Sequence, residues 1–172
     1  MRVRLPLLPP FIYNHFMKVL VAYYSKTGNT KKVALEIAKA LKADIDEVID
    51  LKKRSGIIGW LIGGRDAMKE RQTQITVTKD PENYDLVIIG TPIWAWNTTP
   101  AIRTYITQYK NKIKKIVFFI TSGSTPPAKP VIYLETLAGK KSIDSEGWTE
   151  AELKDPVIYK QKFEAFINRI KS

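Results

Sequence analysis

Short apolar runs alternate with segments of helical periodicity along this chain, and this alternation restricts the fold more than any other feature of the sequence. Residues 18–24, 85–90 and 115–121 are nearly continuous apolar runs, which is typical of strands that are covered on both faces. Between them, apolar residues recur every three or four positions, as in amphipathic helices. Strands that alternate with helices in one domain predict an α/β fold, in which helices cover both faces of a parallel sheet.

Helix signals and two weaker strand patterns complete the expected order of elements. A helical pattern follows Gly28, similar patterns begin at Pro100 and Pro130, and a last helix ends the chain. Residues 43–51 alternate apolar and polar side chains and predict a second strand. Residues 141–148 form a poor strand by composition, but the alternation requires a fifth strand there. We therefore expect a five-stranded parallel sheet between two layers of helices.

The first sixteen residues differ from the rest of the chain. Two arginines precede an apolar stretch that three prolines interrupt, and no small-residue cleavage site follows, so the pattern of a signal peptide is missing. We expect residues 1–16 to be an extension, either disordered or added by an upstream start, and residues 17–172 to form one domain. No run of about 18 apolar residues occurs, so we expect no membrane span and a cytoplasmic protein.

The chain has no Cys and a single His, His15, which lies in the extension. The lack of Cys excludes disulfides, iron–sulfur clusters, thiolate zinc sites and Cys nucleophiles. With one His, multi-histidine metal sites and a Ser-His-Asp triad are poor hypotheses. We therefore expect no metal site and no catalytic side chain, so that a bound organic cofactor has to supply any redox chemistry.

Residues 25–30 lie between the first expected strand and the first expected helix. Three of these residues carry hydroxyls, Gly28 adds flexibility, and the N–H groups of a helix N-terminus are available to an anion. Simple N-capping would explain one hydroxyl but hardly three. The segment is neither a Walker A loop nor a Gly-x-Gly-x-x-Gly fingerprint. It therefore predicts a phosphate site of another type.

Two further loops follow buried strands and should reach the same edge of the sheet, where α/β folds bind ligands. Residues 91–100 carry Trp94 and Trp96, whose indole faces could stack on a planar ring or instead pack on the following helix. Residues 121–127 offer small hydroxyl and glycine residues that let the backbone approach the polar edge of a ring. One phosphate and one flat, polar-edged ring together describe flavin mononucleotide (FMN).

The same three loops resemble those of the flavodoxin family. Residues 25–30, Ser-Lys-Thr-Gly-Asn-Thr, are similar to the family's phosphate loop, Ser/Thr-x-Thr-Gly-x-Thr, and residues 90–97 and 121–124 are similar to its two ring-contacting loops. The resemblance implies a flavodoxin-like three-layer sandwich with strand order 2-1-3-4-5 and FMN as the cofactor. It places the FMN phosphate at Ser25, Lys26, Thr27, Gly28, Asn29 and Thr30, and the isoalloxazine at Pro92, Ile93, Trp94, Ala95, Trp96, Asn97, Thr121, Ser122, Gly123 and Ser124.

Two features depart from the family pattern. No Asp or Glu occurs between Asp85 and Leu134, whereas flavodoxins generally hold FMN in acidic surroundings. The second loop also has no Gly between Thr91 and Pro100, where many members use a glycine for a backbone flip toward the one-electron-reduced flavin. Both departures bear on how the chain would tune a flavin for one-electron transfer.

An FMN-binding flavoprotein that acts in electron transfer is the leading interpretation, and an NAD(P)H-dependent quinone or FMN reductase is the alternative. The formal charge of +11 suits an acidic redox partner, such as a ferredoxin-like protein, or the anionic NAD(P)H. We expect no nucleic-acid partner, because the basic residues scatter along the chain without a recognisable motif. A third interpretation is a protein of this shape that has lost FMN.

An insertion of residues 52–71 separates the second expected strand from the third. Its apolar residues predict a partly amphipathic helix that glycines interrupt. This helix would either cover one face of the sheet, or serve as a flap near the flavin or a homodimer contact with Trp60 exposed. Its basic residues could meet an acidic partner, although a solvated face is the commoner explanation.

Overall fold

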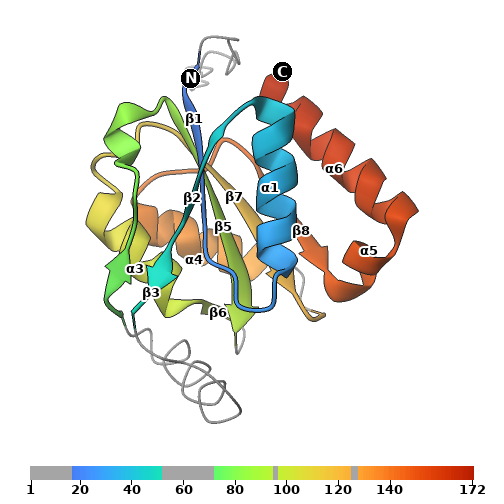
Figure 1. The fold of residues 1–172 in the computed structure, drawn as a ribbon, viewed down its shortest axis with the longest axis horizontal. Coiled ribbons are helices and arrows are strands. Elements are labelled where there is room, and N and C mark those ends of the chain that lie inside the picture. The colour runs from blue at the N-terminus through green and yellow to red at the C-terminus, as the bar shows by residue number, and fades with distance from the viewer. Residues whose placement is uncertain (1–16, 52–71, 95–96, 125–127) are drawn as a thin grey trace, which may run out of the picture.

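A parallel sheet forms the centre of the protein (Figure 1). The computed structural model describes residues 17–51, 72–94, 97–124 and 128–172, so the expected extension and the insertion with Trp60 lie outside the described residues. The parallel strands run in the order β2-β1-β5-β7-β8, which is 2-1-3-4-5 when these strands are counted along the chain. The predicted flavodoxin-like topology is therefore confirmed. The strands are β1 (Val19–Tyr23), β2 (Asp44–Glu47), β5 (Leu86–Trp94), β7 (Ile116–Ser122) and β8 (Ser145–Thr149).

The second expected strand is split in two. β2 pairs with β1 only as far as Glu47, because β1 ends at Tyr23, the partner of Glu47 in the register. The chain then forms β3 (Ile49–Asp50), which pairs antiparallel with β4 (Ile75–Thr76) in a separate small sheet. Prediction of one strand over residues 43–51 was therefore wrong in its extent, since hydrophobic alternation does not report where a neighbouring strand stops.

Helices cover both faces of the sheet, as expected. Alternate side chains of β1 enter two separate cores: Val21 packs with α1 and α6, whereas Leu20 packs with α3 and α4. Figure 1 shows α1 and α6 on one side of the sheet and α3 and α4 on the other. Within the described residues, no helix is both long and apolar enough to cross a membrane. The helices are α1 (Asn29–Leu41), α3 (Pro100–Tyr109), α4 (Ala128–Ala138), α5 (Glu150–Lys154) and α6 (Pro156–Lys171), with a short 3-10 turn at Pro81–Asn83.

The fifth strand, β8, is built from a sequence of low strand propensity, Ser-Glu-Gly-Trp-Thr. Trp148 anchors it, because its side chain is only 1% exposed and contacts the ring of Phe166 on α6 edge-on, with ring centres 5.7 Å apart. β8 also pairs with β7, the ring centre of Trp148 lies 6.0 Å from that of Tyr159, and polar side chains of α6 add further support. Long-range contacts of this kind leave no local pattern in the sequence, which explains why residues 141–148 looked unlike a strand.

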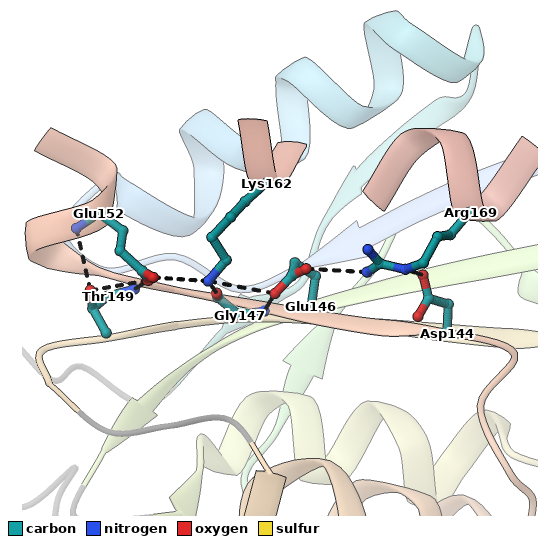
Figure 2. A network of polar contacts seen from close by, with 7 residues as sticks. All are labelled: Asp144, Glu146, Gly147, Thr149, Glu152, Lys162 and Arg169. Carbon is teal, nitrogen blue, oxygen red and sulfur yellow. Dashed lines mark hydrogen bonds and ion pairs between the residues drawn. The ribbon is translucent and has the colours of Figure 1, made fainter. Parts of the chain in front are cut away.

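Two basic side chains of α6 connect to β8 and α5 in one network (Figure 2). Lys162 donates to the carbonyl oxygen of Gly147 at 2.6 Å and to Glu152 at 3.0 Å, and its ammonium lies 3.6 Å from Glu146. Arg169 donates to Asp144 at 2.8 Å and to Glu146 at 3.1 Å. Burial by itself would raise the pKa of Glu152, but hydrogen bonds from the Thr149 amide and Lys162 hold this pKa below its ordinary value of 4.5.

Replacing Lys162 by Met should lower the free energy of unfolding by about 1–3 kcal/mol, because Gly147 and the two glutamates lose a shared donor. Urea denaturation at pH 7 measures the effect. Lys160→Met is the matched control, since Lys160 is 75% exposed and should change stability by less than about 0.5 kcal/mol.

The effect of the Lys162 substitution should depend on pH. Because the folded pKa of Glu152 is lowered, its stabilising contribution is full above pH 4.5 and is lost as the pH falls below that value. The stability difference between the Lys162→Met variant and wild type should therefore shrink in acid; a difference that grows there would contradict the assignment.

Candidate functional site

The carboxyl ends of the parallel strands meet at one edge of the sheet and enclose a hollow of about 160 Å³. All three predicted loops contribute to it, as does the segment after β8. A larger hollow of about 250 Å³ lies at the opposite edge, beside Met17 and Tyr84, but no predicted site residue lines it. The smaller hollow is thus the candidate site. Its lining consists of Thr27, Asn29, Pro92, Ile93, Trp94, Thr121, Ser122, Gly123 and Glu150.

The first loop leaves the N-terminus of α1 open toward an anion. Gly28 is the N-cap residue, with a φ of 96° that favours glycine, and its amide donates to the Ser25 hydroxyl at 3.2 Å. The first helical hydrogen bond runs from the Lys32 amide to the Gly28 carbonyl at 2.9 Å. In the part of the chain that the structure describes, no side chain caps the helix, and no acid occupies its first turn. The positive end of the helix dipole is therefore available beside Asn29 and Thr27, which line the hollow.

A hydrogen bond between two buried threonines ties the first loop to the third. The hydroxyls of Thr30 and Thr121 are 2.8 Å apart, and the two residues are 1% and 3% exposed. Thr30 stands in the first turn of α1. Thr121 and its partner Pro92 form the last pair in the register between β7 and β5. This contact holds the helix N-terminus over the end of β7. In the structure the Thr30 hydroxyl thus connects two loops, a role that its position in the sequence did not reveal.

The second loop is a short hairpin rather than an open loop. β5 continues past Gly90 as far as Trp94, and β6 (Asn97–Thr98) pairs back on it in antiparallel fashion. The hydroxyls of Thr91 and Thr98 lie 3.0 Å apart inside the hairpin. β5 extends past Gly90 because Thr91 and Pro92 still pair with residues of β7. The hairpin therefore projects Trp94 from a supported strand.

The buried side chain of Arg103 supports this hairpin through a hydrogen bond. It is 2% exposed and lies in the first turns of α3, from where it donates to the Thr98 carbonyl at 3.4 Å and to the Tyr133 hydroxyl at 2.9 Å. Tyr133 belongs to α4, which follows the third loop. The guanidinium group therefore links the second loop to the helix that follows the third.

The indole of Trp94 forms one apolar wall of the hollow. Tyr24 meets this ring edge-on, with centres 5.6 Å apart, and the ammonium of Lys26 lies 5.2 Å from its centre. Trp94 is half-buried, so part of its surface remains accessible to a ligand. Because aromatic rings favour contact with flat partners, this wall suits a planar ring.

The predicted site residues fall into three groups. Those that line the hollow are Thr27, Asn29, Pro92, Ile93, Trp94, Thr121, Ser122 and Gly123. Those that belong to the same loops but are not part of the lining are Ser25, Lys26, Gly28, Thr30, Asn97 and Ser124. Ala95 and Trp96 lie outside the described residues.

Glu150 is a lining residue that the sequence analysis missed. It follows β8 directly and is exposed. A sequence signal for its position exists in Thr149-Glu-Ala-Glu152, which has the Ser/Thr-x-x-Glu spacing of a capping box. The structure contains that box, with the Thr149 amide donating to Glu152 at 2.8 Å. This motif could have located the junction of strand and helix that carries Glu150.

Comparison with known proteins decides the family. The flavodoxin family model matches residues 18–170. The chain belongs to the flavodoxin family. A flavoprotein of Lactobacillus acidophilus NCFM, solved in complex with FMN, is 28% identical with a TM-score of 0.68, and the match covers 80% of this chain and 96% of that one. A Bacteroides eggerthii DSM 20697 protein assigned as a flavoprotein is 24% identical with a TM-score of 0.72, over 91% of this chain and 99% of that one. A flavodoxin from the domain Archaea shares the fold at 10% identity and a TM-score of 0.57, over 90% and 97% of the two chains.

Proposed function

We propose that this flavodoxin-family protein binds FMN in the hollow at the carboxyl ends of its strands and acts in electron transfer. The observation that carries the proposal is the meeting of three loops around one hollow, where an uncapped helix N-terminus and the ring of Trp94 are both available. The FMN complex of the Lactobacillus relative, at 28% identity, supports the choice of ligand.

The described residues fit FMN in chemistry. The phosphate would lie against the first turn of α1, where Thr27 and Asn29 supply polar groups. The ring would lie between Trp94 and the third loop, where an added Cβ at Gly123 would meet no atom within 4 Å and the backbone is therefore open to close approach. When bound, FMN supplies the electron-transfer chemistry. The residues of this chain bind it, orient its ring and shield one face of the ring from water.

An acidic redox protein is the partner that the charge of the chain favours. The formal charge is +11, and lysines such as Lys26 and Lys31 lie on or next to the first loop. A basic protein attracts an acidic one over a distance of about a Debye length, which raises the rate of encounter. We therefore propose electron transfer between proteins, with NAD(P)H-dependent reduction as the competing activity.

Titration of the full-length apoprotein with FMN tests the cofactor. We expect one equivalent of FMN to bind with quenching of flavin fluorescence, and riboflavin to bind more weakly because it lacks the phosphate. A protein that takes up neither flavin would overturn the proposal. Anaerobic mixing of the loaded protein with NADPH then tests the role: slow or absent bleaching of the flavin supports a carrier, whereas rapid bleaching assigns a reductase instead.

A further inference from the structure

We propose that Glu150 lowers the reduction potential of a flavin bound in the hollow, because its carboxylate opposes the negative charge that the ring acquires on reduction. The inference rests on the proposed function. It assigns a role to the residue that directly follows the fifth strand, β8, outside the three loops that define the site.

The first argument is the position of Glu150. In the register of the sheet, Thr149 of β8 pairs with Ser122 of β7, so the next residues along each strand, Glu150 and Gly123, leave the sheet side by side. Ser122 and Gly123 line the hollow together with Glu150. The carboxylate therefore belongs to the side of the hollow formed by the third loop, where the proposed ring would lie.

The second argument is that this carboxylate has no hydrogen-bonding or ion-pair partner in the described part of the chain, where it stands in the first turn of the short helix α5. Within the described residues, Glu150 makes no hydrogen bond and no ion pair, whereas each of the other described acids makes at least one. Those acids are Glu36, Asp44, Asp46, Glu47, Asp50, Asp80, Glu82, Asp85, Glu135, Asp144, Glu146, Glu152, Asp155 and Glu164. A charge without a structural partner keeps its full electrostatic effect on a ligand beside it.

Among the described residues, no cation forms an ion pair with Glu150, although Lys154 lies four residues further along α5. Lys162, which reaches β8 and α5 from α6, is already engaged by Glu146, Gly147 and Glu152 (Figure 2). Lys26 lies over the ring of Trp94, which belongs to the second loop. The chain has no acid between Asp85 and Leu134, so Glu150 supplies to the site a negative charge that the second and third loops lack.

The reaction that this charge affects is the two-electron reduction of FMN. The ring takes up two electrons from the redox partner and one proton from solvent at neutral pH, and it gains one negative charge. A nearby carboxylate raises the free energy of the reduced form relative to the oxidised form. The same carboxylate changes the free energy of the oxidised complex much less, because the oxidised ring does not carry the added charge. The apoprotein does not carry that charge either.

The test compares the wild-type protein with Glu150→Gln, each loaded with FMN and equilibrated with a dye of known potential. The ratio of affinities for reduced and oxidised FMN should rise roughly fivefold in the variant, which is about 20 mV for a two-electron couple. Glu164→Gln is the matched control, because Glu164 is 61% exposed on α6 and pairs only with Lys160 among the described residues. The difference for Glu150 should also shrink at high salt.

Each outcome of this test has a definite meaning. Equal ratios for Glu150→Gln and wild type would overturn the inference while leaving FMN binding intact, and failure of the wild type to bind FMN would overturn the proposed function instead. Thermal melting of the two apoproteins should differ only slightly, because in the described fold Glu150 makes no hydrogen bond or ion pair and interacts only with the N-terminus of the short helix α5. Glu150→Lys should raise the ratio further than Gln does, since it reverses the charge; a lower ratio would contradict the inference.

Discussion

Gly90→Ala should lower the free energy of unfolding by about 3 kcal/mol, at the upper end of the usual cost of overpacking a core. A Cβ at this position would lie 2.0 Å from the ring of Phe119, and its next two neighbours would be atoms of the same ring at 2.4 and 2.7 Å. Gly90 stands in β5 between Tyr23 of β1 and Phe119 of β7. The ring cannot turn aside freely, because Phe119 is fully buried.

Urea denaturation of the variant measures this cost, and Gly123→Ala is its control. A Cβ at Gly123 would meet no atom within 4 Å, so that variant should unfold within about 0.5 kcal/mol of wild type. Shortening the opposing ring, as in Gly90→Ala with Phe119→Leu, should recover part of the loss relative to the two single variants added together. A Gly90→Ala protein as stable as wild type would show that the sheet can separate at this point.

Asn29→Asp should change the stability of the apoprotein and its affinity for FMN in opposite directions. The new carboxylate is nearly isosteric and lies at the N-terminus of α1, where it should stabilise the apoprotein by about 0.3–1 kcal/mol. The same charge faces the proposed phosphate, because Asn29 lines the hollow. Affinity for FMN should therefore fall on the order of 100-fold.

Riboflavin provides the internal control for this variant. It has the ring but no phosphate, so its affinity should change by less than about threefold between wild type and Asn29→Asp. Thermal melting without flavin and fluorescence titration with each flavin give the three quantities. Equal losses of affinity for both flavins would place the phosphate elsewhere and would remove the assigned role of the α1 N-terminus.

The architecture and most of the hollow could be predicted from local patterns. The runs at residues 85–90 and 115–121 are apolar because both faces of their strands are buried, and the structure has β5 and β7 there. Topology then brings the ends of β1, β5 and β7 to one edge without further information. The first loop was recognisable because a phosphate needs small residues before a helix, and this need leaves a compact motif.

Contacts between distant segments were not predictable in this way. The pairing of the Thr30 and Thr121 hydroxyls joins residues that are 91 positions apart. The place of Glu150 in the hollow follows from the pairing of β8 with β7, and β8 itself is held by Trp148 and by Lys162 of α6. None of these contacts produces a periodic pattern in the sequence.

By itself, the sequence determined the α/β class, the strand order through the family resemblance, and the loops that would face a phosphate and a flat ring. These features depend on periodicity and on short motifs, which are local. The tertiary structure decided which side chains of those loops reach the hollow, that the second loop is a hairpin, and that an acid from the far end of the sheet joins the site. Such features depend on strand register and on side chains that meet across the core, and only the folded chain brings these together.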